Sequence, residues 1–134
     1  MEVPKGTPLG KQKFERRTYT LDNLEIAHTI VDTLEDKLGE DILLLDIRDV
    51  STIADYFVIC SGTSDRMLDA LADAVQREVR TQHHLKARIE GDPRTGWLLA
   101  DYGGVIVHLF SPDRREFYQL EELWSEGKIV LHLQ

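Results

Sequence analysis

The stretch that most constrains this chain is GWLLADYGGVIVHLF, residues 96–110, in which two apolar runs meet at a Gly-Gly pair. Two glycines between strand-like runs favour a two-residue hairpin turn, because glycine accepts the positive φ that such a turn needs. A two-residue turn also fixes the register, which places Leu99 opposite His108 and Trp97 opposite Phe110. The chain is therefore expected to contain a β-sheet with this hairpin in it.

Alternation along the two strands divides the hairpin into two faces. One face is nearly all aliphatic and is expected to lie under helices: Leu98, Ala100, Tyr102, Val105, Val107 and Leu109. The other face mixes aromatic, aliphatic and polar side chains: Trp97, Leu99, Asp101, Ile106, His108 and Phe110. Such a mixture is typical of a protein-binding surface. The alternative is that this mixed face also packs a helix, with Asp101 and His108 bonded to each other across a diagonal.

Helical spacing of apolar residues predicts two helices before the hairpin. The first begins at Thr20 or Asp22, either of which can cap it, and ends at Gly39, which suits the left-handed position after a helix. Its apolar residues are Leu24, Ala27, Ile30, Val31, Leu34 and Leu38. The second begins after the N-cap Ser64 and ends near Arg80.

Short apolar runs predict three strands besides the hairpin, at residues 41–47, 56–60 and 85–91. The segment SPDRREFYQLEELW, residues 111–124, predicts a last helix with Ser111 as its N-cap and Gly127 as its stop. This order of helices and strands predicts a single α/β domain with a mixed β-sheet and helices on one main face.

Charge is unevenly distributed along the chain. The net charge is −8, but residues 1–17 carry +3, so the remainder carries −11. An acidic body repels nucleic-acid phosphates and attracts basic proteins, so direct contact with RNA is expected to be minor at most. Residues 1–19 are expected to form a flexible basic tail before a domain at 20–126, with 127–134 as a C-terminal extension.

Several classes of protein are disfavoured by simple counts. The longest apolar runs, residues 42–45 and 105–107, are too short to span a bilayer, so no membrane association is expected. The only cysteine is Cys60, which excludes an intramolecular disulfide and fits a reducing compartment. No secretory signal pattern is visible, and a cytoplasmic location is expected.

Metal and catalytic patterns are weak. Glu90 and Asp92 have the spacing of a nucleotidyltransferase magnesium site but run directly into Pro93, while Asp46 and Asp49 are three positions apart. The histidines lack the spacing of zinc ligands. No enzyme activity, metal or cofactor is expected. A magnesium-dependent nucleotidyltransferase with an atypical site remains the alternative.

A hydrolytic alternative also remains open at this point. Ser61 or Ser64 could act as a nucleophile with His108 and Asp101, although the chain has no nucleophile-elbow pattern.

Three motifs then follow one another at the spacing of a known family: ADYFVICSGTSDR, GWLLADYGGVIVHLF and REFYQLEELW. Over residues 21–124 the chain resembles the ribosomal silencing factor family, also called Iojap or RsfS. The resemblance implies a nucleotidyltransferase-like fold without the catalytic acids. It also implies binding to the large ribosomal subunit, at the universal large-subunit protein fourteen on the intersubunit face. Such binding would block joining of the small subunit when nutrients are short, and the free protein is implied to be a homodimer.

The resemblance also implies a set of partner-binding residues. By position, Trp97, Asp101, Tyr102 and His108 match the second motif, and Tyr118, Leu120, Leu123 and Trp124 match the third. The mixed face of the hairpin adds Leu99 and Phe110 to the expected partner-binding residues. Asp55, Gly62 and Ser64 match the first motif. The chain departs from the family at Gly104, where an acid is common, so a contact made by that acid is in doubt here. A third possibility, besides silencing factor and enzyme, is an oligomerisation module without a ribosomal partner.

Overall fold

A mixed sheet of strand order β3-β4-β5-β2-β1-β6 lies at the centre of the computed structural model, which describes residues 10–119 and 127–134. The six strands are β1 Glu40–Asp46, β2 Tyr56–Ser61, β3 Arg88–Asp92, β4 Trp97–Asp101, β5 Val105–Phe110 and β6 Lys128–Leu133. Strands β2 and β5 run parallel, and the other neighbouring pairs run antiparallel. The predicted α/β class and the mixed sheet are confirmed.

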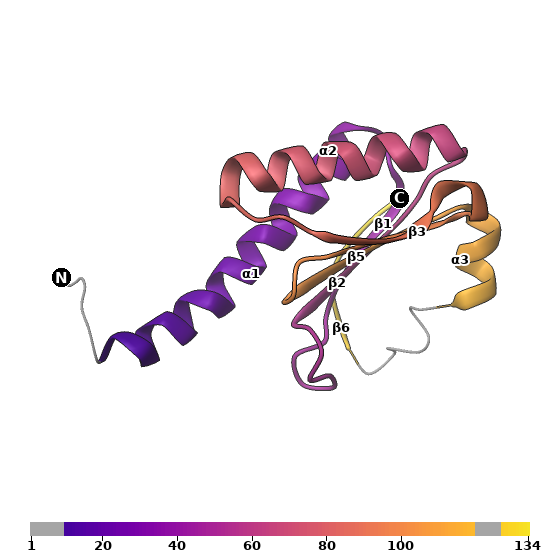
Figure 1. Ribbon diagram of the computed structural model, residues 1–134. Helices are drawn as coiled ribbons and strands as arrows, with labels where there is room; N and C mark the ends of the chain where they lie inside the picture. Colours follow the sequence, from indigo (N-terminus) through magenta and orange to yellow (C-terminus); the bar gives the residue numbers. More distant parts are fainter. Residues whose placement is uncertain (1–9, 120–126) are drawn as a thin grey trace.

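Two helices cover one face of the sheet. Helix α1 spans Gly10–Asp36 and helix α2 spans Asp65–His83, and Figure 1 shows both on the same side of the strands. The short helix α3, Pro112–Tyr118, lies on the other side at one end of the sheet (Figure 1). A single 3-10 turn, η1 Pro93–Thr95, joins β3 to β4.

The main core fills the space between these two helices and the sheet. The face of the hairpin that was predicted to be covered is buried there, with Val105, Val107 and Leu109 almost fully enclosed. They meet apolar residues of α1 and α2 such as Ile30 and Leu71. Truncating one of these large side chains to alanine typically lowers the free energy of unfolding by about 2–5 kcal/mol. The residues of this face therefore stabilise the fold and are not available to a partner.

A smaller apolar cluster lies on the opposite face of the sheet. Its buried members come from strands β1, β2 and β5 and from the loop between β1 and β2: Leu43, Leu45, Ile47, Ala54, Phe57, Ile59 and Phe110. The partly buried side chains of Val50, Trp97 and Ile106 pack against it. The face that was predicted to be a docking surface is therefore partly covered by the chain itself.

The N-terminal boundary of the first helix differs from the prediction. Helix α1 begins at Gly10 instead of Thr20 or Asp22, so it occupies about half of the segment predicted as a flexible tail. The physical reason is local, because residues 10–20 contain no proline and are rich in Lys, Gln, Glu and Arg, which are good helix formers.

The end of the same helix is also corrected. Leu38, not Gly39, takes the left-handed conformation, with a φ of 65°. Glycine is required at position 39 for space, because a Cβ there would lie 2.5 Å from the Sγ atom of Cys60. The tight approach of the helix end to β2 selects the glycine.

The two serine N-caps predicted for the later helices are confirmed, whereas Thr20 and Asp22 lie inside α1 and do not cap it. The Oγ atom of Ser64 accepts a hydrogen bond from the N–H of Met67 at 3.0 Å, and that of Ser111 accepts from the N–H of Arg114 at 3.3 Å. Helix α3 is shorter than predicted, because Gln119 adopts a φ of 47° and ends it. The remaining predicted turns of that helix lie outside the described residues.

The C-terminal segment contains an element that the sequence analysis missed. Residues 127–134 were predicted as an extension, but Lys128–Leu133 form the edge strand β6, which pairs antiparallel with β1. The third predicted strand, 85–91, is shifted to Arg88–Asp92 and forms the other edge of the sheet. Strand prediction is weakest at such edges, where burial is shallow and alternation of apolar residues fades.

Removal of residues 1–17 is expected to leave the fold intact. Where side-chain burial is described, the buried apolar residues of α1 run from Ile26 to Leu34, so the truncation removes none of them. The melting temperature measured by circular dichroism should fall by less than about 5 °C, which is roughly 1 kcal/mol for a domain near this size. A larger fall would show that the removed residues contribute to the core.

Candidate protein-binding surface

The register of the hairpin agrees with the prediction from its Gly-Gly turn. Leu99 pairs with His108, and Trp97 pairs with Phe110. The turn is closed by a hydrogen bond from the N–H of Tyr102 to the carbonyl of Val105 at 2.9 Å. The mixed face of the hairpin therefore exists as predicted.

The mixed face is not uniformly exposed. Its side chains at Trp97, Leu99, Asp101 and Ile106 are partly accessible. His108 retains 8% of its surface and Phe110 only 2%. These two residues were predicted to bind a partner, but they form the floor of the surface, because the second apolar cluster and the strand β2 enclose them. The accessible part of this face is therefore limited to Trp97, Leu99, Asp101 and Ile106.

His108 is an unusual component of this floor. Its ring lies edge-on to Phe57, with centroids 4.9 Å apart, and stacks parallel to Phe110 at 6.0 Å. Neither ring nitrogen has a hydrogen-bond partner among the described residues. Burial without a partner penalises the charged form and lowers the pKa of His108 to about 4. The ring is therefore a neutral packing element at physiological pH.

Asp101 has a local partner instead of His108. Its Oδ1 atom accepts a hydrogen bond from the N–H of Gly103 at 2.7 Å, which stabilises the hairpin turn. The alternative in which Asp101 and His108 bond to each other is wrong. The hydrolytic arrangement is not formed either, because Ser61 is buried and accepts a hydrogen bond from Arg115 at 3.0 Å.

Tyr102 lies on the helix-covered face of the hairpin. Its ring packs against the main core, and burial raises its pKa to about 12. Its hydroxyl is buried with no hydrogen-bond partner among the described residues. The structure therefore separates Tyr102 from the accessible residues of the mixed face, although the family resemblance grouped them together.

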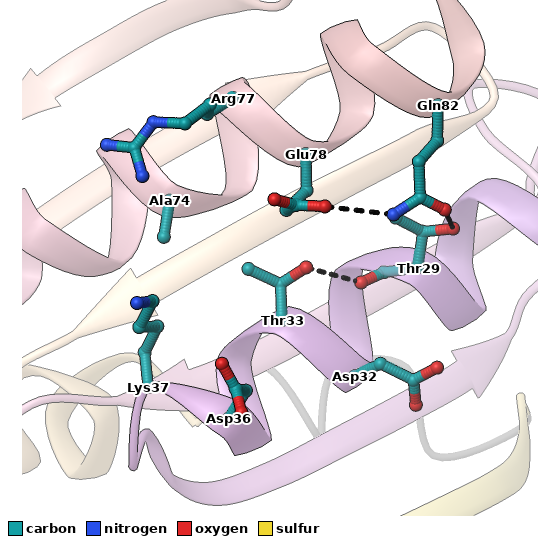
Figure 2. Close-up of a pocket in the computed structure, with 9 residues that line it drawn as sticks. All are labelled: Thr29, Asp32, Thr33, Asp36, Lys37, Ala74, Arg77, Glu78 and Gln82. Carbon is teal, nitrogen blue, oxygen red and sulfur yellow. Dashed lines mark hydrogen bonds between the residues drawn. The ribbon is translucent and has the colours of Figure 1, made fainter.

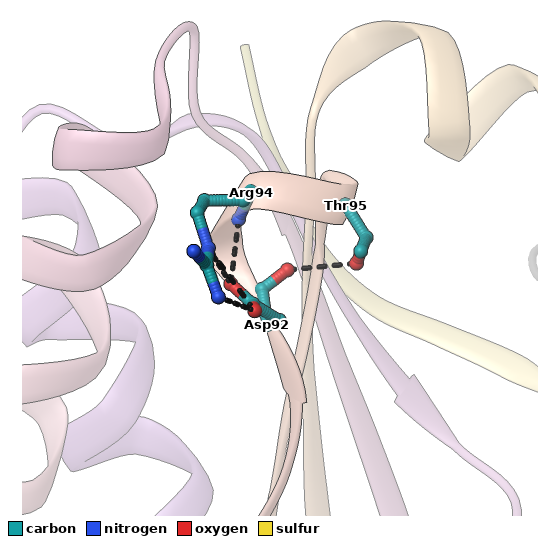
Figure 3. Close-up of polar contacts among 3 residues, drawn as sticks. All are labelled: Asp92, Arg94 and Thr95. Atoms are coloured by element: carbon teal, nitrogen blue, oxygen red, sulfur yellow. Dashed lines mark hydrogen bonds and ion pairs between the residues drawn. The ribbon is translucent and has the colours of Figure 1, made fainter.

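Helix α3 begins where β5 ends and is held by the turn η1. The N–H of Ser111 donates to the carbonyl of Gly96 at 2.9 Å, and the Nε atom of Arg114 donates to the carbonyl of Thr95 at 3.0 Å. Figure 3 shows that this turn is itself braced by Asp92, which pairs with Arg94 at 2.8 Å. The start of α3 is thus fixed beside Trp97.

Helix α3 carries an exposed aromatic residue that the sequence analysis did not consider. Phe117 has 73% of its surface exposed, yet it was absent from the predicted site. Its exposure depends on where the short helix sits, which the sequence pattern does not give. The side chain of Tyr118, and residues Leu120, Leu123 and Trp124, lie outside what the structure describes.

Two of the acids considered for a magnesium site are bonded by neighbouring arginines. Asp46 is bonded by Arg48, whose hydrogen bonds lower the pKa of that carboxyl, and Asp92 is bonded by Arg94 in the same way. In the described part of the chain, no three His, Cys, Asp or Glu side chains are grouped as metal ligands. Burial raises the pKa of the Cys60 thiol to about 12.

Among the residues that the structure describes, no helix is long and apolar enough to cross a membrane.

A groove of about 420 Å³ runs between α1 and α2 on the outer side of the molecule (Figure 2). Thr33 and Ala74 are buried there, and Thr33 bonds the carbonyl of Thr29 at 2.7 Å. The rim carries both signs of charge, including Lys37 and Asp36, so it selects neither an anion nor a cation. We interpret this groove as the seam between two helices whose small residues allow close approach.

Comparison with known proteins identifies relatives of this chain. The family model described as "Ribosomal silencing factor during starvation" matches residues 15–133. This range extends beyond the predicted 21–124 and includes strand β6. A ribosomal silencing factor from Bacillus subtilis is 39% identical over 72% of this chain and 81% of its own length.

Two further relatives come from different sources. The mouse protein "Mitochondrial assembly of ribosomal large subunit protein 1" is 38% identical over 72% of this chain and 43% of its own length. The crystal structure of a protein from Chromobacterium violaceum is similar with a TM-score of 0.72 and 32% identity, covering 76% of this chain and 85% of that one.

Proposed function

The chain belongs to the ribosomal silencing factor family, and from this premise we propose that it binds the large ribosomal subunit and prevents the small subunit from joining it. The observation that supports a binding function is the mixed face of the hairpin, where the partly accessible Trp97, Leu99 and Ile106 surround one acid, Asp101. Large apolar side chains with a few polar groups suit the centre of a protein interface.

We propose that the contacted component is the universal large-subunit protein fourteen, on the intersubunit face. Charge supports this choice, since the chain carries −8 and a basic ribosomal protein would attract it. Complementary charge mainly speeds encounter and selects the partner, while the buried apolar contacts hold the complex. Contact with ribosomal RNA is proposed to be minor, because the same acidic body repels phosphates.

The proposed mechanism is steric and makes or breaks no covalent bond. The joining surface of two ribosomal subunits is extensive, so a protein of 134 residues that covers one essential contact is enough to prevent assembly. Translation would then fall when nutrients are short, in agreement with the starvation role in the name of the family model. We further propose a cytoplasmic setting, supported by the bacterial relative, and a homodimer in the absence of ribosomes.

The protein is expected to co-sediment with isolated large ribosomal subunits and to reduce their joining to small subunits. Binding should not change when nucleotides are removed, because the proposed contact is between side chains of two proteins. The measurement is a sucrose-gradient profile of mixed subunits with increasing amounts of the protein. Undiminished joining at saturating protein would contradict the proposal.

Each of the two alternatives predicts its own result. Turnover of a nucleoside triphosphate in the presence of magnesium would favour the nucleotidyltransferase. An oligomerisation module would form dimers but would stay at the top of the gradient, away from the large subunits.

A further inference from the structure

Positive charge gathers at one end of this acidic chain. The second half of α2, the loop after it and the first residue of β3 hold four exposed bases: Arg77, Arg80, Lys86 and Arg88. Residues 76–88 contain one acid, Glu78, and therefore carry +3, whereas the whole chain carries −8. Glu78 already accepts a hydrogen bond from the side-chain amide of Gln82 at 2.9 Å.

Most of these bases have no acidic partner within the described residues. Arg88 pairs with Glu90 at 3.1 Å, but Arg77, Arg80 and Lys86 form no ion pair there. Arg77 and Arg80 also line a hollow of about 320 Å³ on the surface of α2, with Asp73 as the acid among its described lining residues. Two guanidinium groups at such a hollow can bind an oxyanion through several charge-assisted hydrogen bonds.

The N-terminal part of α1 adds positive charge at the same end. Thr29 of α1 lies beside the last turn of α2, where its Oγ1 atom is 2.8 Å from the Nε2 atom of His83. The part of α1 before this contact extends away from the sheet (Figure 1). Its first eight residues, 10–17, carry +3, although Asp22 and Glu25 follow them nearer the contact. Two basic segments that are distant in sequence therefore lie at one end of the helix layer.

The start of α1 is a poor place for lysine if helix stability alone is considered. The aligned peptide dipoles leave a partial positive charge at the N-terminus of a helix, which favours acids and disfavours bases. Yet Lys11 and Lys13 lie in the first turn of α1, and this turn contains no acid. Arg80 and His83, in the last turn of α2, do suit the dipole of that helix. Helix stability thus accounts for part of the positive charge on α2 but not for that on α1, which an anion outside the chain would offset.

This end of the molecule borders the mixed face of the hairpin. The hairpin turn reaches α1, because a Cβ at Gly104 would meet the side chain of Asn23. Arg88 of β3 lies opposite Asp101 in the ladder between β3 and β4. The two acids at this border each have a local bond: Asp101 with a backbone N–H of the turn, and Asp55 with the amide of Asn23 at 3.0 Å. A component that flanks a partner on the mixed face would therefore lie against the bases.

We propose that this end, residues 10–17 of α1 together with residues 77–88, contacts the phosphate backbone of ribosomal RNA beside the protein that binds the mixed face. A nucleic-acid backbone carries an anion at every nucleotide, so it can meet bases that are spread over two helices and a loop. Contacts to phosphate position a protein without reading sequence, so no base preference is expected. This inference rests on the proposed function and assigns the minor RNA contact named there to one end of the molecule.

Four full-length proteins test this inference: the parent, Arg77→Gln/Arg80→Gln, Lys11→Gln/Lys13→Gln, and the control Lys37→Gln/Arg66→Gln. The control removes two exposed bases at the opposite ends of the same two helices and changes the net charge equally. Affinity for isolated large ribosomal subunits is titrated at several salt concentrations, and folding is checked by thermal melts. Each phosphate contact contributes about 0.7–0.9 to the slope of log affinity against log salt concentration.

Both test variants should bind about tenfold more weakly at low salt, with a slope smaller in magnitude by about 1–2 and with unchanged melts. The control should keep the parental slope. Protein-free ribosomal RNA is the second probe, which the parent should bind weakly at low salt and the test variants less.

A parental slope in either test variant, or a control that loses as much as they do, would overturn the inference. Weaker binding of subunits without any binding of protein-free RNA by the parent would also overturn it, in favour of a contact with an acidic protein. If the parent does not bind large subunits, the proposed function itself fails. Parental binding with unchanged slopes in the variants removes only this inference.

Discussion

Trp97→Ala is expected to weaken binding to the large ribosomal subunit by roughly thirty-fold, since a central aromatic anchor contributes about 2 kcal/mol or more to an interface. Trp97 is the largest partly accessible side chain on the mixed face of β4 and β5. Its ring also crosses Gly91 of β3, where an added Cβ would lie 2.9 Å from the Trp97 Cε3 atom. The substitution should therefore also lower the free energy of unfolding by about 1–2 kcal/mol. This is less than for a fully buried tryptophan, because Trp97 is only partly buried.

The neighbouring residue supplies the control. Leu98 points to the opposite face and is buried in the main core, so Leu98→Ala should destabilise the fold by about 2–5 kcal/mol. Its binding loss should disappear once affinity is corrected for the fraction of folded protein, measured in the same buffer. Trp97→Ala should keep its loss after that correction. A corrected affinity equal to that of the parent would exclude the hairpin face as the docking surface.

Acidification is expected to destabilise the protein through His108. Folding holds the pKa of this ring at about 4, against the ordinary histidine value of 6.5, so the folded state binds fewer protons than the unfolded state between these two pH values. Stability from this group is complete above about pH 6.5 and is lost as the pH falls toward 4. The difference corresponds to about 3 kcal/mol, of which most should be gone at about pH 4.5.

Urea unfolding of the parent, His108→Leu and His28→Gln over this pH range isolates the effect. His108→Leu removes the titrating ring and should flatten the loss of stability with acid by about 2–3 kcal/mol. His28 is exposed on α1, so its replacement should leave the parental slope unchanged. Equal slopes for all three proteins would show that His108 stays neutral in the unfolded chain too or is charged in the folded one.

Local sequence signals correctly predicted those features of the fold that depend only on neighbouring residues. The Gly-Gly turn was enough to predict the register of the hairpin, and a serine before a helical pattern was enough for both N-caps. Alternation also separated the two faces correctly. Each of these signals acts over a few residues, where backbone geometry and hydrogen bonding decide the outcome.

The parts that were missed depend on distant contacts. Alternation shows which face a residue occupies but not how deeply it is covered, and Phe110 is buried because a distant loop carrying Ile47 and Ala54 packs over the same face. The buried guanidinium of Arg115 bonds the carbonyl of Asp41, more than seventy residues earlier in the chain, and no local pattern predicts this contact. Strand β6 was missed because Ile129 and Val130 are exposed, so its pattern lacks a clear inner face.

The pairing of β6 with β1 has a consequence for how the protein is made. Strand β1 ends at Asp46 and its outer neighbour begins at Lys128, so the sheet is incomplete until residues 128–133 have been synthesised. At roughly 5–20 residues per second, the outer edge of β1 waits for about 4–16 s during synthesis. An unpaired strand edge is a template for pairing with other chains. The newly made chain is therefore most exposed to misassembly while it is still attached to a ribosome, the particle whose assembly we propose its finished form controls.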